Sequence, residues 1–228
     1  MLPWRYYRNH EAISETQQEA LKDKRVLVVG CGGLGGYVVE YLGRLGVGHL
    51  VVVDGDVFDD SNLNRQILSS NLNLGKPKVL AAKQRMQAVN PLVEVTAIQG
   101  LLDESNALAF MEGCDVVVDA LDGIPSRLIL QASAAKAGIP MVHGAIAGWC
   151  GQVCIIQPGE NRLEKIYGNT TTAKGMEETQ GNLSFTAALV AGIQAAETVK
   201  LLLGIGRPLK GLLYIDLLNG ECDEIPLG

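Results

Sequence analysis

The chain has 228 residues, of which 47% are apolar and 19% are charged, so its length and composition allow one large domain or two small ones with a sizeable hydrophobic core. Its formal net charge of −6 argues against a partner with a phosphate backbone and against an anionic membrane surface. The five cysteines include no Cys-x-x-Cys pair, which argues against a disulfide scaffold and against a tetracysteine zinc site.

Neither end of the chain nor its most apolar tract has the pattern of a targeting or membrane segment. The first residues, Met1 to Arg8, contain no apolar core region, so we predict no secretory signal. The tract at residues 187–205 carries Gln194, Glu197 and Lys200 on a helical face, which indicates a core helix. We therefore expect a cytoplasmic protein that binds neither membrane nor nucleic acid.

Strand and helix patterns alternate from the N-terminus onward. A Ser14-x-x-Gln17 spacing predicts the start of a short helix within a helical arm at residues 1–24. Continuous apolar runs predict strands, and apolar residues at helical spacing predict helices between them. The predicted strands are residues 25–29, 49–53, 93–98, 116–120 and 141–145, and the predicted helices are 34–45, 77–89, 105–111 and 124–137. Apolar strands separated by helices predict a parallel sheet covered on both faces.

After Gly144 the pattern changes. We predict a strand at residues 151–156, a long helix at 183–203, a strand at 212–215 and a short tail. The polar segment at about 167–181 is longer than most connections, so we predict a mobile loop there. No linker divides the chain, so we expect a single α/β domain over residues 1–228. Its predicted sheet is doubly wound, Rossmann-like and mostly parallel, flanked by helices, with added C-terminal strands.

A glycine cluster follows the first predicted strand and opens the next helix. It reads Gly30-x-Gly32-Gly33-x-Gly35, and Asp54 ends the following strand. In this context the glycines let the backbone approach phosphate oxygens, the helix N-terminus favours negative charge, and the carboxylate accepts ribose hydroxyls. The pattern predicts a nucleotide site, and by itself it is most typical of NAD enzymes.

Charged residues near this loop favour a triphosphate over a dinucleotide. Arg65 follows the second strand and Lys78 begins a helix. Backbone amides alone hold most dinucleotide pyrophosphates, whereas a phosphate under nucleophilic attack needs fixed cations. Asp122 follows the strand at 116–120 and is therefore expected at the carboxyl edge of the sheet, where a carboxylate can hold Mg²⁺.

Together these motifs resemble the ThiF/MoeB/HesA group of adenylyltransferases, bacterial relatives of the ubiquitin-activating enzymes. The likeness runs from Arg5 to about Asp216. It rests on Arg5-Tyr-x-Arg8, Gly30-x-Gly-Gly-Leu-Gly35, Asp54-x-Asp56, Asn62-x-x-Arg65-Gln66, Gly75-x-Pro-Lys78, Asn90-Pro91 and Asp122.

The resemblance implies an enzyme that binds MgATP and adenylates the C-terminal glycine of a small ubiquitin-like sulfur-carrier protein ending in Gly-Gly. Such carriers serve thiamin, molybdopterin or tungstopterin and related biosynthesis. The resemblance also implies a homodimer, and a separate sulfur donor protein, since no persulfide-carrying domain follows the motifs. The implied roles are ribose binding by Asp54 next to Asp56, phosphate binding by Asn62, Arg65 and Lys78 with support from Gln66, metal binding by Asp122, and contact of Arg8 with the ATP of the opposite subunit.

The sequence departs from the family pattern in three places. Many relatives carry two zinc-binding Cys-x-x-Cys pairs, which are absent, so we predict no zinc. Some relatives have a cysteine in the crossover loop, but the segment at about 167–181 has none. Gly123 stands where relatives often have Asn. Cys31 at a helix N-terminus is interpreted as a packed small residue, with a lowered thiol pKa as the alternative, and His10, His49 and His143 are interpreted as structural.

Three other functions stay open. A threonylcarbamoyladenosine dehydratase uses the same kind of ATP site to activate a carboxylate on tRNA, although the negative charge of this chain argues against tRNA. An NAD-dependent oxidoreductase would use the glycine loop without Mg²⁺. A non-catalytic relative would act as a scaffold, although Arg65, Lys78 and Asp122 are all retained.

Overall fold

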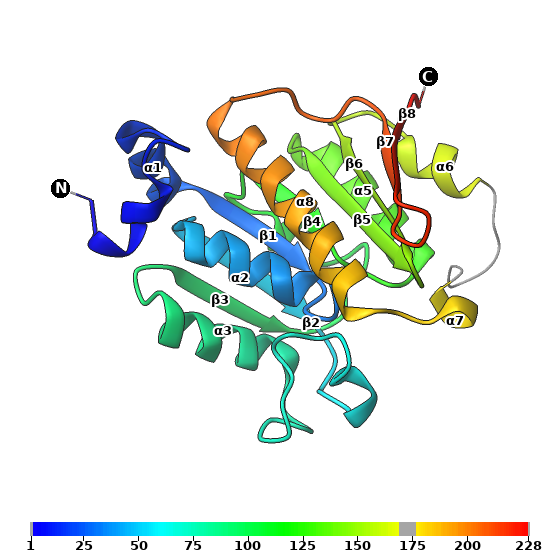
Figure 1. The fold of residues 1–228 in the computed structure, drawn as a ribbon, viewed down its shortest axis with the longest axis horizontal. Coiled ribbons are helices and arrows are strands. Elements are labelled where there is room, and N and C mark those ends of the chain that lie inside the picture. The colour runs from blue at the N-terminus through cyan, green and yellow to red at the C-terminus, as the bar shows by residue number, and fades with distance from the viewer. Residues whose placement is uncertain (1, 169–176, 228) are drawn as a thin grey trace.

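The chain folds around one mixed sheet with helices on both faces (Figure 1). The computed structural model describes residues 2–168 and 177–227. The sheet has eight strands in the order β3-β2-β1-β4-β5-β6-β7-β8. The strands are β1 (Arg25–Val29), β2 (His49–Asp54), β3 (Glu94–Gln99), β4 (Val116–Asp119), β5 (Met141–Ala147), β6 (Cys150–Ile156), β7 (Leu212–Asp216) and β8 (Glu221–Ile225).

The helices fall close to the predicted positions. The α-helices are α1 (Glu15–Ala20), α2 (Gly35–Leu45), α3 (Lys78–Val89), α4 (Ala107–Phe110), α5 (Ile124–Ala137), α6 (Arg162–Tyr167), α7 (Glu177–Gln180) and α8 (Ser184–Leu203). The 3-10 helices are η1 (Trp4–Asn9), η2 (Leu21–Asp23) and η3 (Asp60–Asn62). The Ser14–Gln17 capping box at the start of α1 is present, as its spacing predicts.

The strand order places a switch point between β1 and β4. From β1 the chain runs outward through β2 to β3, and it then crosses to β4 on the other side of β1. All pairs among β1 to β5 are parallel, and the pairs from β5 to β8 are antiparallel. This confirms the predicted doubly wound, mostly parallel sheet with added C-terminal strands. In such sheets ligands bind at the carboxyl ends of the strands, next to the switch point.

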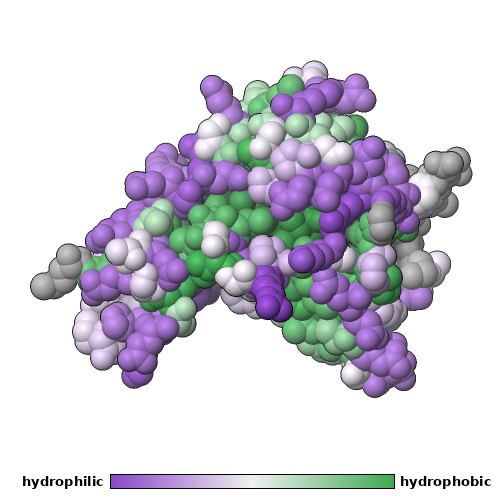
Figure 2. Space-filling model, turned by 90° about the horizontal axis from the view of Figure 1, so that it is seen from above, coloured by the Kyte–Doolittle hydropathy of each residue, from purple (hydrophilic) through white to green (hydrophobic). Residues whose placement is uncertain are grey.

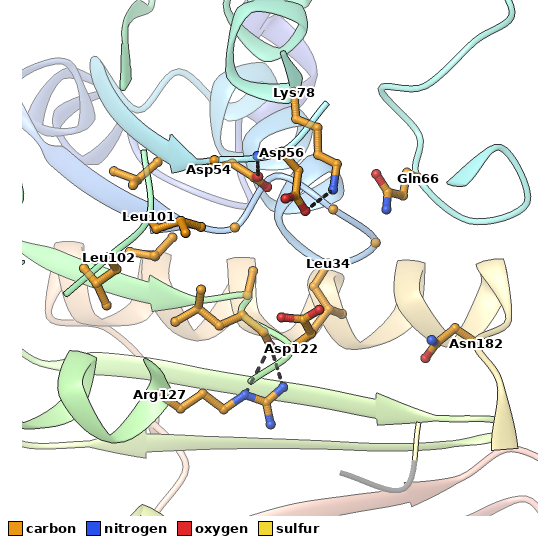
Figure 3. A pocket seen from close by; sticks show the side chains of 18 of the residues that line it. Leu34, Asp54, Asp56, Gln66, Lys78, Leu101, Leu102, Asp122, Arg127 and Asn182 are labelled. Atoms are coloured by element: carbon orange, nitrogen blue, oxygen red, sulfur yellow. Dashed lines mark hydrogen bonds and ion pairs between the residues drawn. The ribbon is translucent and has the colours of Figure 1, made fainter. Parts of the chain in front are cut away.

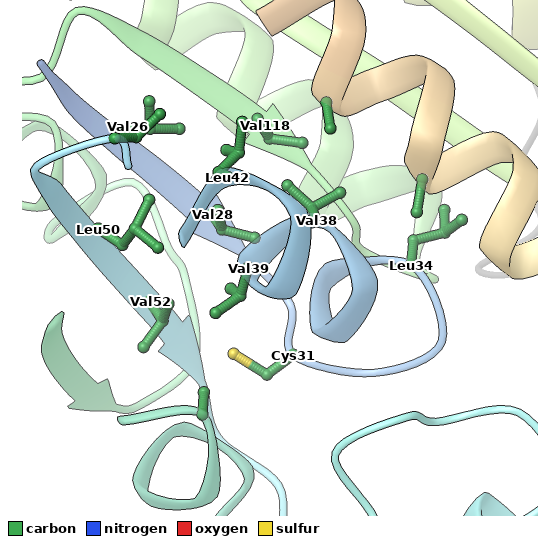
Figure 4. Close-up of a cluster of buried hydrophobic side chains, with 14 of the residues drawn as sticks. Val26, Val28, Cys31, Leu34, Val38, Val39, Leu42, Leu50, Val52 and Val118 are labelled. Atoms are coloured by element: carbon green, nitrogen blue, oxygen red, sulfur yellow. The ribbon is translucent and has the colours of Figure 1, made fainter. Parts of the chain in front are cut away.

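Two apolar layers cover the central strands. Val26 and Val28 of β1 belong to the core shared with α2, α3 and α8 (Figure 4). Leu27 and Val29 belong to the core on the opposite face, shared with α4, α5 and α6. Because both faces of the strand are buried, the strand shows a continuous apolar run instead of alternation.

Helix α8 is apolar and long enough, by length and composition alone, to cross a membrane. In this structure it packs on β4, β5, β6 and α2, and half of its most apolar window is buried. Gln194 and Glu197 lie on its buried face. This packing confirms the prediction of a core helix.

Two elements were missed by the sequence patterns. The predicted short tail forms β8, a fully exposed strand that pairs with β7. Helix α6 lies where no element was predicted, and it buries Leu163. Of the predicted mobile segment, Tyr167 belongs to α6 and residues 177–180 form α7, while residues 169–176 lie outside the described residues.

Candidate functional site

A cavity of about 360 Å³ opens at the carboxyl ends of β1, β2 and β4 (Figure 3). It lies at the switch point of the sheet, where the fold predicts a ligand site. Nine of its lining residues were singled out by the sequence: Gly30, Gly32, Gly33, Asp54, Asp56, Arg65, Gln66, Lys78 and Asp122. The structure therefore gathers most of the predicted site residues into one space.

The glycines of the loop fall into two groups. A Cβ on Gly30 would lie 2.4 Å from the carbonyl oxygen of Ala120, and one on Gly35 would lie 1.8 Å from the carbonyl oxygen of Gly30. A Cβ on Gly32 or Gly33 would meet nothing closer than 3.5 Å. Gly30 and Gly35 are therefore required by backbone packing, whereas Gly32 and Gly33 keep open a cradle in which backbone amides can approach phosphates.

Asp54 fixes the loop from the end of β2. One carboxylate oxygen accepts the backbone N–H of Cys31 at 2.7 Å, and the other accepts the backbone N–H of Asp56 at 2.8 Å. Each oxygen keeps a second lone pair, so the carboxylate can also accept hydroxyl groups of a ribose. Leu101 and Leu102, which follow β3, form an apolar part of the cavity wall.

Two predicted cations line the cavity: Arg65, near the middle of the segment between β2 and α3, and Lys78, at the start of α3. Lys78 is 6% exposed at the first turn of α3, and its Nζ lies 3.0 Å from a carboxylate oxygen of Asp56. Arg65 is half-buried and donates from Nη1 to the backbone oxygen of Ser61 and to the side chain of Asn64. Both cations are therefore held near the glycine cradle, where they can bind phosphate oxygens.

Asp122 is an exposed residue on the loop after β4 and lines the same cavity. Its carboxylate accepts no hydrogen bond from any of the residues that the structure describes. Residues 2–168 and 177–227 contain no group of three or more His, Cys, Asp or Glu residues that could hold a metal ion. The single carboxylate of Asp122 nevertheless fits Mg²⁺, which proteins often bind through one or two carboxylates together with substrate phosphates.

Two polar lining residues were not anticipated. Arg127 projects from the first turns of α5, is 5% exposed, and donates to the backbone oxygen of Leu121 (Figure 3). Asn182, just before α8, lines the other side. No sequence signal marks either residue, because an arginine in a helix is usually solvated and Asn182 belongs to no motif.

Besides Gly35, which is not among the lining residues, two predicted residues lie away from the cavity wall. Asn62 is buried in η3, where its side-chain oxygen accepts the backbone N–H of Asp59 at 3.1 Å. Its side chain stabilises the loop, and it is not among the lining residues. Arg8 is exposed in η1, whose Tyr6 packs on Gly46 at the C-terminal end of α2. The glycine loop precedes the opposite end of that helix, about 16 Å away.

Gln66 has the burial expected of a supporting residue. It is 6% exposed, and its Oε1 has no hydrogen-bond partner among the described residues. Its Nε2 lies 3.5 Å from the position that a Cβ on Gly32 would take. An unpaired buried amide oxygen beside the cradle is available to a ligand or to water.

The buried cysteine of the loop is not activated. Cys31 is fully buried, and burial raises its pKa well above the ordinary value of 9.0, with the carboxylate of Asp54 as a second cause. The interpretation as a packed small residue is therefore correct, and the alternative of a lowered pKa is wrong. Burial outweighs the favourable field of the helix N-terminus.

A doubly wound sheet with a glycine cradle, a carboxylate at the end of β2 and two cations at its switch point is typical of a nucleotide-binding enzyme. The chain belongs to the ThiF family, whose model matches residues 6–228. It is an adenylyltransferase of that family, which argues against the oxidoreductase and scaffold alternatives.

Similar proteins share most of the chain. The SAMP-activating enzyme E1 of Haloferax volcanii is 37% identical over 226 residues, which cover 96% of this chain and 84% of that protein. The sulfur carrier protein adenylyltransferase of Thermus thermophilus is 39% identical over 213 residues, with coverage of 90% and 79%. A crystal structure of E. coli MccB with MccA-N7isoASN has a TM-score of 0.86 at 20% identity, covers 98% of this chain and 72% of that one, and shares the fold.

Proposed function

We propose that this enzyme uses ATP and Mg²⁺ to adenylate the C-terminal carboxylate of a small ubiquitin-like sulfur-carrier protein ending in Gly-Gly. The observation that carries the proposal is the meeting, in one cavity, of the glycine cradle, the cations Lys78 and Arg65, and the open carboxylate of Asp122. The Thermus relative is a sulfur carrier protein adenylyltransferase and the Haloferax relative is a SAMP-activating enzyme, which supports the choice of substrate.

The reaction makes one bond to phosphorus and breaks another. A carboxylate oxygen of the carrier attacks the α-phosphorus of ATP, the bond from that phosphorus to the bridging oxygen breaks, and pyrophosphate leaves with the electron pair. The product is a mixed anhydride whose acyl carbon is electrophilic. A separate sulfur donor protein would then attack this acyl carbon and release AMP.

The residues of the cavity contribute position and charge. The backbone at Gly32 and Gly33 binds phosphate oxygens, and Lys78 and Arg65 stabilise the charge that develops on the leaving pyrophosphate. Asp54 orients the ribose. Asp122 would hold Mg²⁺, which neutralises phosphate charge when bound. The apolar wall at Leu101 and Leu102 gives a surface on which a purine base can pack.

A homodimer would complete this site. Arg8 lies at the far end of α2 from its own cavity, so it can contribute to catalysis only in a partner subunit. Apolar side chains are not confined to the interior, and on the face seen in Figure 2 they gather in a hollow between hydrophilic lobes. Helices α2 and α8 pack together, and Phe185 and Leu189 on the outer side of α8 are 46% and 40% exposed. Such apolar surface is typical of contacts between subunits.

ATP:pyrophosphate exchange that depends on a Gly-Gly carrier tests the proposal. We expect exchange by the wild type, and a loss of roughly hundredfold or more in Asp122→Ala. Because Asp122 is exposed and makes no core contact, this variant should keep the wild-type melting temperature. Asp223→Ala, on exposed β8, is the matched control with unchanged exchange. Absence of exchange with every such carrier would refute the proposed substrate, and full activity of Asp122→Ala would refute the metal role.

A further inference from the structure

Beneath the cavity, two polar side chains meet inside the apolar core. Asp119 ends β4 and His143 lies on β5, and the two are register partners in this parallel pair. Both are 0% exposed, and Nδ1 of His143 lies 2.7 Å from Oδ2 of Asp119. A buried carboxylate lowers stability unless hydrogen bonds satisfy it. The partners of this pair are therefore informative.

The hydrogen bonds of the pair extend to α5 and α6. The hydroxyl of Tyr167 accepts from Nη1 of Arg127 and, at 3.0 Å, from Nε2 of Gln152. Its own proton is then directed to Nε2 of His143, which lies 3.1 Å away. His143 in turn donates from Nδ1 to Asp119. This assignment uses every proton once and requires neutral His143, in agreement with burial, which lowers the pKa of its imidazole.

The network ends on the backbone of a single residue. The N–H of Leu121 donates to Oδ1 of Asp119 at 3.0 Å. The carbonyl oxygen of Leu121 accepts from Nε of Arg127 at 3.1 Å and from Nη2 at 2.5 Å, as the dashed lines in Figure 3 show. The next residue is Asp122. Because the Asp122 carboxylate has no side-chain support among the described residues, the backbone of Leu121 determines where it stands in the cavity.

We propose that His143 and Tyr167 are positioning residues for adenylation. They hold Arg127 and Asp119 on the backbone of Leu121 and thereby place the Asp122 carboxylate at the nucleotide. The proposal rests on the proposed function, in which Asp122 holds the metal. Apolar residues of similar volume would fill the same space at no greater cost in stability, so packing alone does not require the network. A displacement of about 1 Å at a reacting site can lower a rate by roughly a hundredfold.

The test removes the hydroxyl that joins Arg127 to His143. Tyr167→Phe keeps the ring and loses this link. Tyr41→Phe, which removes a hydroxyl from α2 on the opposite face of the sheet, is the matched control. We expect Tyr167→Phe to lower kcat for exchange about tenfold, with the control unchanged. By calorimetry, we expect Mg²⁺ to raise ATP affinity less in Tyr167→Phe than in the wild type, while the affinity without Mg²⁺ stays within about twofold.

Asp122→Asn removes the charge that would hold Mg²⁺, so it gives the smallest increase in ATP affinity that Mg²⁺ should produce. The proposal is overturned if folded Tyr167→Phe keeps the wild-type kcat and the wild-type increase in ATP affinity with Mg²⁺. It is also overturned if the ATP affinity of this variant without Mg²⁺ falls as much as its kcat. His143→Asn, which retains a donor to Asp119 but cannot reach Tyr167, should behave as Tyr167→Phe does. If the wild type shows no exchange, the proposed function fails, and the Mg²⁺-dependent gain still decides whether the network positions Asp122.

Discussion

At the scale of single residues, the glycine loop shows one residue type serving two purposes. Gly35 is required because the carbonyl of Gly30 occupies the space of a side chain, whereas a Cβ on Gly32 would make only ordinary contacts with Gln66. The sequence motif predicts both glycines without distinguishing them. The distinction depends on how closely the backbone approaches itself, which the spacing does not encode.

This difference predicts that substitution by alanine lowers stability at Gly35 and ATP affinity at Gly32. Gly35→Ala should lower the melting temperature by about 5 °C or more, or prevent folding, because its Cβ collides with backbone. Gly32→Ala should melt within about 2 °C of the wild type and bind ATP about tenfold more weakly or worse, because its methyl group occupies the cradle. Thermal denaturation and calorimetry measure the two effects. Equal loss of stability in both variants would contradict this division.

The thiols should differ widely in reactivity. Burial raises the pKa of Cys154 to about 12, and it also raises the pKa of Cys31 and Cys114. Cys222 is exposed and Cys150 is half-buried. At pH 8 we expect Ellman's reagent to modify Cys222 quickly and Cys150 slowly, and to reach the other three only after unfolding. Fast modification of three or more thiols in the native protein would contradict this prediction.

The place of a residue in the site was predictable where a motif fixes its backbone position. It was not predictable where the tertiary structure decides which partner the side chain contacts. Asp54, Lys78 and Asp122 line the cavity because strand ends and a helix start place them there. Asn62 carries the expected residue type, but its side chain closes a capping box with Asp59. Arg127 was missed because an arginine in a helix is usually solvated, and only the tertiary structure reveals its burial.

At the scale of elements, burial decides which ones the sequence reveals. Strands β1, β2 and β4 were predicted to within one residue at each end, because their residues are apolar on both faces. Strand β8 was missed because all five of its residues are exposed and three are acidic. Backbone pairing with β7, which no side-chain pattern records, makes it a strand.

The buried pair between β4 and β5 makes stability depend on pH. The folded-state pKa of His143 lies below its ordinary value of 6.5 because burial disfavours the imidazolium. The unfolded chain therefore binds the proton more readily, so the free energy of unfolding falls as the pH drops below about 6.5 and is unaffected by this group at higher pH. We expect the melting temperature to decline from pH 7 to pH 5.5.

Substitution separates this contribution from that of other groups. His143→Asn should flatten the decline, whereas His10→Asn, at an exposed position, should leave it as in the wild type. Melting followed by circular dichroism across this pH range is sufficient. An unchanged slope in a folded His143→Asn variant would show that the buried pair does not account for the acid sensitivity.

At the scale of the whole molecule, the separation between Arg8 and its own cavity predicts complementation between subunits. Arg8→Ala and Asp122→Ala should each be inactive in exchange. Mixed and reassembled at equal amounts, they should recover about a quarter of wild-type activity, because half of the dimers are mixed and each contains one complete site. Recovery requires that Arg8 acts on the partner's site. No recovery, with mixed dimers verified, would contradict this role.

The ion pair between Lys78 and Asp56 gives the cavity a counter-ion of its own. Lys78 is nearly enclosed, while the side chain of Asp56 is 68% exposed. The ammonium group is therefore neutralised before any nucleotide arrives, and releasing Asp56 into water, where most of it already lies, costs little. A ligand phosphate then replaces the Asp56 carboxylate beside Lys78. A polyphosphate can do this because of its higher negative charge, whereas an uncharged nucleoside cannot. The ion pair thus favours a polyphosphate over an uncharged nucleoside.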